Sequence, residues 1–465
     1  MTAAGLDSET AALLKKVARP VLLPLLRRLR SRRTTKVPRL SVRDLLPQAE
    51  VPTRVDVRED RTILVNGEPF FPLALYYARD EIDDESGEGL ARLRAMGFNT
   101  VFFSGGLESA NRLDRIWGAG LYVCYRPPGQ LCCDFVLLKK VVSRFARHPA
   151  LLFWEMDDEP VLNRVKFSNV EIGCRVVRSV DPYHPILCNQ WLSDLDETEE
   201  MRRWAGLADV YGFSTYPVPS WCWGCRLKLV EQGWPHSIAV VGAQTELWMS
   251  YAPGKPIIPV LQAWGWNCLE DEEAAYPTYQ ESRFMAYQAV IRGAKGLHHY
   301  GMVSSSRPNF ACGIPPKIHE DLDRTHADFL EARRRNRRFW SYYSKVVKEL
   351  SLMSCVFTSR DAAWTLEIRE RQTPECGKES IEWRVKRHLN SFVILLVNAS
   401  DANVTVVILA PELKGRVLKL WGEAKSVEVN SDGLFRDVLE PYAVRIYSDQ
   451  PDLLAPLSDF HTSID

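Results

Sequence analysis

Short apolar segments alternate with amphipathic segments through most of the chain. The apolar segments, each expected to be a buried strand, lie at residues 70–78, 99–105, 120–127, 151–160, 185–191, 209–217, 257–265 and 296–303. The stretches between them, and one after the last, carry apolar residues at three- and four-residue spacing and predict helices. Eight strand–helix units in succession predict an α/β fold, a (β/α)8 TIM barrel of parallel strands. A doubly wound open sheet is the rival, but YYARDEIDD after the first strand is not the glycine-rich loop typical of that fold.

The pattern changes on both sides of the predicted barrel. Residues 53–72 indicate strands around a tight turn at Asn66-Gly67. Beyond residue 350 the alternation of apolar and polar positions predicts a C-terminal antiparallel β-sandwich domain. We therefore expect a poorly ordered basic arm over 1–50, a barrel with an N-terminal hairpin over 51–345, a sandwich over 350–450 and a tail over 451–465.

The basic arm contains the leucine-rich segment AALLKKVARPVLLPLLRRLRSRRTTK, which prolines interrupt. It lacks an apolar core followed by a small-residue cleavage site, so a secretory signal is not expected. A transit peptide, or a helix that contacts a membrane surface, is the alternative to a poorly ordered arm. Because no apolar run reaches the ~18 to 20 residues that a membrane span needs, we predict no transmembrane segment.

Composition narrows the classes of partner. The 465 residues include 59 basic and 59 acidic side chains, and this zero formal charge argues against nucleic acid. The 11 cysteines are scattered, and the C-x-x-C at Cys222 and Cys225 has no second pair or histidine at zinc spacing. We predict no metal and no other cofactor. Unpaired thiols fit a reducing compartment, which favours a cytoplasmic location; the sequence does not indicate an oligomeric state.

In a TIM barrel the active site lies at the carboxyl ends of the strands. Candidate site residues at these ends are Tyr77, Arg126, Asp158, Glu159, Asn189, Trp191, Tyr216, Gln262, Trp264, Trp266, His298 and Tyr300. The set lacks the histidine or cysteine ligands of a catalytic metal and the glycines of a phosphate site. Aromatic rings that stack on sugars, with amides and acids that bind hydroxyl groups, indicate a carbohydrate ligand. For Tyr216 and His298, structural roles in the core and at the barrel rim are the alternatives.

The segment LFWEMDDEP, residues 152–160, carries Glu155, Asp157, Asp158 and Glu159. Burial at the barrel mouth beside other acids raises the pKa of a carboxyl group, as a general acid requires at neutral pH. Glu159 is therefore the candidate proton donor, unless these acids cap the next helix or pair with nearby cations. Glu155 lies within the strand, and we expect it to point into the barrel and pair with a cation.

The longer segment HPALLFWEMDDEP, residues 148–160, resembles the fourth-strand signature of clan A glycoside hydrolases. In that clan an Asn-Glu-Pro ends the strand and its Glu is the general acid/base; here Asp158-Glu159-Pro160 takes that position. Further segments at 65–77, 97–103, 179–190, 208–217 and 283–301 are similar to family 2-type enzymes and to uncharacterised relatives with a DEP motif. The resemblance spans roughly 55–305. It implies a glycosidase in which Glu159 is the acid/base and Asp158 binds a sugar hydroxyl.

The seventh predicted strand departs from this pattern. The clan places its nucleophilic Glu where IIPVLQAWGWN has Gln262, and an amide cannot act as that nucleophile. An acid from the loop Glu270–Glu273 is one substitute, as nucleophile or as base. A substrate acetamido group oriented by Asp158, as in N-acetylhexosaminidases, is a second. Carbohydrate binding without cleavage is the third, and Trp221 and Trp223 would extend such a site. We predict a glycoside hydrolase and keep the last two as alternatives.

Overall fold

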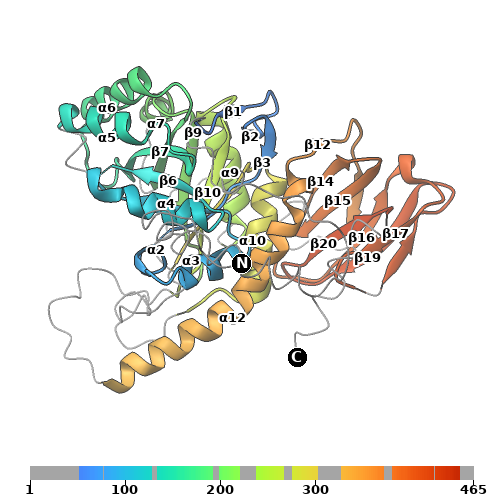
Figure 1. Ribbon diagram of the computed structural model, residues 1–465. Helices are drawn as coiled ribbons and strands as arrows, with labels where there is room; N and C mark the ends of the chain where they lie inside the picture. The colour runs from blue at the N-terminus through green and yellow to red at the C-terminus, as the bar shows by residue number, and fades with distance from the viewer. Residues whose placement is uncertain are drawn as a thin grey trace, which may run out of the picture.

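Eight parallel strands close into a barrel in the computed structural model, which describes residues 52–76, 78–127, 134–191, 198–219, 237–265, 275–301, 326–370, 380–423 and 425–450 (Figure 1). The strands are β4 (Leu73–Tyr76), β5 (Thr100–Ser104), β6 (Tyr122–Arg126), β7 (Leu151–Asp158), β8 (Ile186–Trp191), β9 (Val210–Thr215), β10 (Ile257–Gln262) and β11 (Leu297–Tyr300). Strand β11 pairs with β4 and closes the cylinder. Each strand falls within a run predicted from the sequence, so the TIM-barrel prediction is confirmed.

Helices follow the strands on the outside of the barrel. They are α2 (Arg79–Asp83), α3 (Glu88–Met96), the short 3-10 helix η2 (Leu107–Ser109), α4 (Ala110–Gly118), α5 (Phe135–Phe145), α6 (Phe167–Val180), α7 (Thr198–Ala205), α9 (Val240–Tyr251), α10 (Tyr279–Ile291) and α12 (His326–Phe357). Local sequence determines where two of these helices begin. The Asp134 side chain accepts from the backbone N–H of Leu137 at the start of α5, and Thr278 and Glu281 form a capping box at the start of α10.

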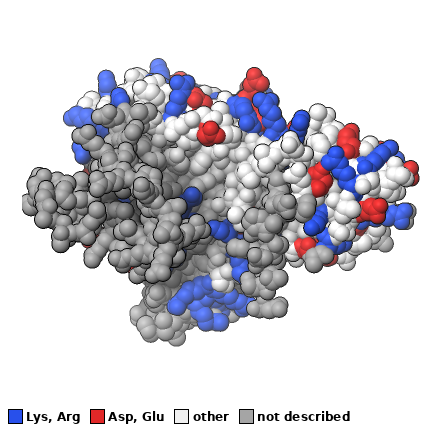
Figure 2. Space-filling model, turned by 45° about the vertical axis from the view of Figure 1, so that its right-hand side comes forward, with Lys and Arg blue, Asp and Glu red and all other residues white. Residues whose placement is uncertain are grey.

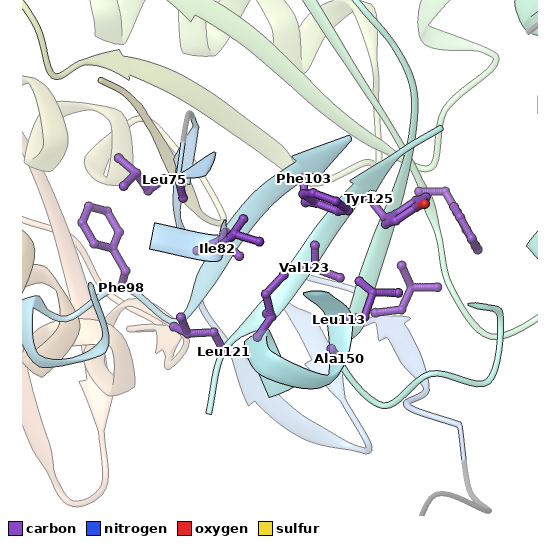
Figure 3. Close-up of a cluster of buried hydrophobic side chains, with 14 of the residues drawn as sticks. Leu75, Ile82, Phe98, Phe103, Leu113, Leu121, Val123, Tyr125 and Ala150 are labelled. Atoms are coloured by element: carbon purple, nitrogen blue, oxygen red, sulfur yellow. The ribbon is translucent and has the colours of Figure 1, made fainter. Parts of the chain in front are cut away.

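Two apolar layers hold the barrel together. Outside, strand residues such as Leu75 and Val123 pack against helix residues such as Ile82 and Leu113 (Figure 3). Inside, a separate cluster that includes Phe153 fills the cylinder. Each such side chain contributes about 1.5–3 kcal/mol by leaving water. The interior is therefore a packed core, and space for a ligand lies at the strand ends.

A small antiparallel sheet precedes the barrel. It contains β1 (Val55–Val57), β2 (Ile63–Val65) and β3 (Glu68–Phe70), and Val65 pairs with Glu68 across a two-residue turn. The turn residues Asn66 and Gly67 both have positive φ, 52° and 87°. This is the geometry of the type I′ hairpin that an Asn-Gly pair favours, and the predicted turn is confirmed.

The C-terminal part forms two antiparallel sheets. One has the order β12 (Arg360–Asp361), β14 (Ile381–His388), β15 (Ser391–Asn398), β20 (Val444–Ser448), β17 (Val417–Leu420) and β18 (Ser426–Glu428). The other has the order β13 (Glu367–Glu370), β16 (Val404–Leu409) and β19 (Leu434–Leu439), and a 3-10 helix, η6 (Pro411–Leu413), follows β16. Their inner faces share one apolar cluster, so the predicted sandwich is confirmed. Basic and acidic side chains are interspersed on its surface (Figure 2), as the zero formal charge suggests.

The barrel and the sandwich share a second apolar core. Helices α10 and α12 lie between them (Figure 1), and Tyr287 and Leu350 pack in one cluster with Leu395 of β15. Helix α12 runs without a break across residues 345–350, where we expected the barrel to end. The predicted domain limits stay predictions, and the arm over 1–50 and the tail over 451–465 lie outside the described residues. In the described ranges no helix is both long and apolar enough to cross a bilayer.

Candidate active site

A bulge near the end of β7 decides which of its acids face the barrel interior. Glu155 pairs with Leu187 of β8, whereas Asp158 pairs with Asn189, so β7 has one extra residue between the two pairs. Strict alternation would turn Asp157 to the side of Glu155. The extra residue turns Asp158 there instead, and both Glu155 and Asp158 contact Arg126. The bulge thus brings two carboxylates to one cation.

Glu155 lies beneath the mouth of the barrel and is fully buried. Its Oε1 accepts from the Tyr76 hydroxyl at 3.1 Å, and its Oε2 lies 3.5 Å from the guanidinium of Arg126. Burial raises the pKa of Glu155 well above its ordinary value, and the Arg126 charge opposes that rise. The expectation that Glu155 points inward and pairs with a cation is confirmed.

Asp158 is held from two sides at the barrel mouth. Its Oδ2 lies 3.0 Å from Nη1 of Arg126, and its Oδ1 accepts from the Asn189 amide at 2.9 Å. The same amide nitrogen lies 3.1 Å from the Ser214 hydroxyl oxygen. Gly212 makes room for the Asn189 side chain, because a Cβ at position 212 would stand 3.0 Å from Oδ1 of Asn189. Asp158 is therefore oriented, and each of its oxygens already has a partner.

Glu159 follows the strand directly and turns toward β9. Its φ of 46° is in the left-handed region that side chains disfavour, and its N–H donates to the Asn189 carbonyl at 3.0 Å. The Ser214 hydroxyl donates to its Oε1 at 2.6 Å. Burial first, and then the charge of Asp158, raises the pKa of Glu159 to about 7, against the opposing effects of Ser214 and Arg126. Such a carboxyl group can both donate and accept a proton at neutral pH.

An aromatic wall stands at the ends of β8 to β11. We use this name for Trp191, Tyr216, Trp264 and Tyr300. The ring of Tyr216 lies 5.5 Å from that of Trp191, 5.7 Å from that of Trp264 and 5.4 Å from that of Tyr300. The wall packs on the apolar cluster inside the barrel. It supplies the flat apolar surface beside polar groups that small-molecule sites require.

Gln262 lies at the end of β10 and is fully buried. Its Oε1 accepts from the backbone N–H of Val218 at 2.9 Å. Its Nε2 donates to the carbonyls of Val218 at 2.7 Å and Trp264 at 3.1 Å. Both ends of the amide therefore bind the backbone of the segments that follow β9 and β10. The contribution of Gln262 to substrate binding stays a prediction.

The two histidines of β11 face opposite ways. His299 Nδ1 lies 2.7 Å from the hydroxyl of Tyr343 on α12, outside the barrel. His298 lies inside, with its ring centre 5.6 Å from that of Tyr76. Neither His298 nitrogen has a hydrogen-bond partner among the described residues. Burial lowers the pKa of His298 to about 3, so the ring is neutral. Its predicted contact with substrate stays a prediction.

The described acids that contact Arg126 or Ser214 come from β7 and the residue after it. In the described segments 186–191, 210–219, 257–265 and 297–301, the ends of β8 to β11 carry no Asp or Glu. The described residues also hold no group of three or more His, Cys, Asp or Glu side chains suited to a metal ion. A second carboxylate facing Glu159 is thus not found at the described ends of β8 to β11.

The structure brings four of the predicted positions, Arg126, Asp158, Glu159 and Asn189, into one polar network. Ser214 was not among the predicted residues. Its position two residues after Gly212, on the same face of β9, is the signal that would have indicated it. Four predicted residues and two segments named above lie outside the described residues: Tyr77, Trp266, Trp221, Trp223, the C-x-x-C at 222–225 and the acidic segment Glu270–Glu273.

Sequence comparison finds no matching family model and no matching curated protein. Solved structures do match the fold. A glycoside hydrolase family 5 structure from Bacteroides vulgatus aligns with a TM-score of 0.55 at 14% identity, covering 85% of this chain and 93% of its own. A structure described as a glycoside hydrolase aligns with a TM-score of 0.52 at 14% identity, covering 86% and 97%. The chain therefore has the TIM-barrel fold of these glycoside hydrolases, with C-terminal antiparallel sheets.

Proposed function

We propose that this protein is a glycoside hydrolase that cleaves O-glycosidic bonds with Glu159 as general acid/base. The observation that carries this proposal is a half-buried carboxyl group at a barrel strand end with a pKa of about 7. At neutral pH a substantial fraction of Glu159 is protonated and can protonate the leaving oxygen. Once it has lost that proton, it can take one from water in a later step.

The surroundings of Glu159 suit a sugar in the mouth of the barrel. The aromatic wall offers ring faces to the C–H surface of a sugar, and Asp158 and Asn189 offer oxygens to its hydroxyl groups. Oδ1 of Asn189 is buried and has no hydrogen-bond partner among the described residues, so it can accept a hydrogen bond from a ligand hydroxyl. The guanidinium of Arg126 lies 3.0 Å from the carboxylate of Asp158 and holds it in place. The chain thus presents a proton donor beside fixed acceptors.

The proposed reaction also requires a second catalytic group. A retaining enzyme needs a carboxylate about 5–5.5 Å from the acid, and an inverting enzyme needs one about 6.5–9.5 Å away. The segment Glu270–Glu273, directly after the β10 end, is our candidate source. Gln262 is excluded from this role by its chemistry, because an amide is neither a carboxylate nucleophile nor a base.

Two alternatives rest on the absence of Asp and Glu from the described ends of β8 to β11. In the first, the substrate's own acetamido group attacks the anomeric carbon, and Asp158 orients it from its position beside Glu159. This would make the protein similar to an N-acetylhexosaminidase. In the second, the barrel binds carbohydrate through the aromatic wall and does not cleave it.

A panel of aryl glycosides, in matched acetamido and hydroxyl forms, separates these functions. We expect turnover by the wild type, with a rate that falls as pH rises above about 7, and loss of turnover in Glu159→Gln. Turnover restricted to acetamido substrates, abolished also in Asp158→Asn, would select the substrate-assisted scheme. If the wild type and Glu159→Gln both bind oligosaccharides and neither cleaves any substrate, the enzyme proposal is rejected.

A further inference from the structure

Five cations meet at the opposite end of the barrel from Glu159, where the strands begin. The cation cluster consists of Arg58, Arg61, Lys295, Arg384 and Lys386. Its members come from the turn between β1 and β2, from the segment between α10 and β11, and from β14. The backbone N–H of Lys295 donates to the carbonyl of Ile257, the first residue of β10. The cluster is thus built into the base of the barrel, where the sandwich meets it.

Three of these cations have partners. The Arg58 guanidinium pairs with Asp60 at 2.8 Å and donates to the carbonyl of Thr358, just after α12. Arg384 pairs with Asp361 at 2.8 Å and donates to the carbonyl of Ile291, the last residue of α10. These contacts balance the negative carboxyl ends of two helices.

Lys386 likewise contacts both an acid and a backbone carbonyl. Its ammonium group lies 2.9 Å from Asp361 and donates to the carbonyl of Ser359 at 2.9 Å. Asp361 therefore serves two cations at once. Each of its oxygens contacts one of them.

The remaining two cations make no hydrogen bond or ion pair in the part of the chain that the structure describes, although the charges of Asp60 and Asp361 act on both. Lys295 is only 7% exposed, yet its ammonium group makes no hydrogen bond or ion pair there. The guanidinium of Arg61 is partly buried and also makes none; it lies along Gly293, where an added Cβ would stand 3.7 Å from its Nη2. Burial lowers the pKa of Lys295 to about 8, with help from the charge of Lys386 and against Asp60 and Asp361.

The charges of this junction do not cancel. Five cations face Asp60 and Asp361, which leaves a surplus of three positive charges. On the flank, Arg292 lies between Glu246 and Glu382, and this group lowers the surplus to two. The two helix ends contribute about −0.5 each, so roughly one positive charge remains uncompensated. The ammonium group of Lys295 makes no hydrogen bond or ion pair with the described residues, and its neighbouring acids, Asp60 and Asp361, already pair with other cations. A small anion would supply the missing contact.

We propose that the cation cluster binds a small oxyanion of the phosphate or sulfate class, between Lys295 and Arg61. Arg61 supplies the planar fork that fits a tetrahedral oxyanion, and Lys295 supplies a point charge. The anion joins the β1–β2 turn to the barrel base, beside the edge of the sandwich. It stabilises the junction of the three parts and lies apart from the proposed catalytic site.

The test is binding of inorganic phosphate to the full chain, by calorimetry and by thermal unfolding at constant ionic strength set with chloride. We expect phosphate to raise the melting temperature more than chloride does. Lys295→Met and Arg61→Met should each weaken phosphate binding by about tenfold or more, since each removes a charge-assisted contact. Arg369→Met is the matched control, because Arg369 lies exposed on the sandwich and pairs with Glu367. Sulfate and glycerol phosphate form parallel arms, and binding of glycerol phosphate would extend the ligand class to phosphomonoesters.

Equal effects of phosphate and chloride on the wild type would overturn the proposal. So would phosphate binding that survives in both Lys295→Met and Arg61→Met. The methionine variants remove a buried charge and keep an unbranched apolar chain, so we expect them to fold. Their melting temperatures in chloride alone verify this.

Discussion

Replacing Glu159 with glutamine keeps the shape of the side chain and an acceptor for the Ser214 hydroxyl, but removes the ionisable group. The ordinary pKa of 4.5 applies to the unfolded chain, whereas the folded pKa is about 7. Between these values the folded state binds more protons than the unfolded state. The free energy of unfolding therefore falls as pH rises through this window.

The magnitude follows from the same two values. Each pKa unit corresponds to about 1.4 kcal/mol, so the rise from 4.5 to about 7 means that ionised Glu159 destabilises the fold by about 3.5 kcal/mol well above pH 7. Below pH 4.5 the penalty is absent, because the group is protonated in both states. Glutamine resembles the protonated acid at every pH. We expect Glu159→Gln to match the wild type near pH 4.5 and to be about 3 kcal/mol more stable at pH 8.

Urea unfolding followed by tryptophan fluorescence at pH 5 and pH 8 measures this difference. Glu428→Gln on the exposed strand β18 controls for the loss of one carboxylate elsewhere in the chain. The informative quantity is the change, between the two pH values, in the stability gap between variant and wild type. A gap that is the same at both values would refute the argument that burial opposes the ionisation of Glu159.

Three further substitutions test neighbouring contacts. Ser214→Ala removes a 2.6 Å hydrogen bond to the ionised form of Glu159, so the pKa of Glu159 should rise further, by about one unit. Carbon-13 NMR of the glutamate carboxyl groups measures this pKa. A lower pKa would contradict the role of Ser214 as a donor to Glu159. Arg126→Met leaves two carboxylates without their cation and should lower the free energy of unfolding by about 3–5 kcal/mol. A variant as stable as the wild type would contradict this expectation. Gln262→Ala leaves the buried N–H and C=O of Val218 unpaired and should cost about 2–3 kcal/mol in urea unfolding; a variant as stable as wild type would show that the amide does not brace this segment.

The order of apolar runs was sufficient to predict the barrel, because strands buried on both faces leave continuous apolar segments and their helices leave a 3.6-residue period. The Asn66-Gly67 turn was equally predictable, since few residue pairs adopt two successive positive φ angles. Such features depend on neighbours in the sequence.

The site was predictable only in part. That Glu155 meets a cation followed from the cost of burying a lone charge, but that Arg126 is this cation depends on the register of β6 against β7. The two backbone contacts of Gln262 depend on the path of the chain after β9, for which no local pattern exists. Long-range contacts of this kind require the folded coordinates.

The bulge in β7 makes the chemistry of the mouth depend on where one extra residue is accommodated in that strand. If the present residues alternated strictly, Asp157 and not Asp158 would share the side of Glu155. Arg126 would then face a different carboxylate, and the proposed proton donor would point elsewhere. The position of one irregular residue, a feature far smaller than any domain, is therefore a route by which the same barrel could present a different acid to its mouth without any amino-acid replacement.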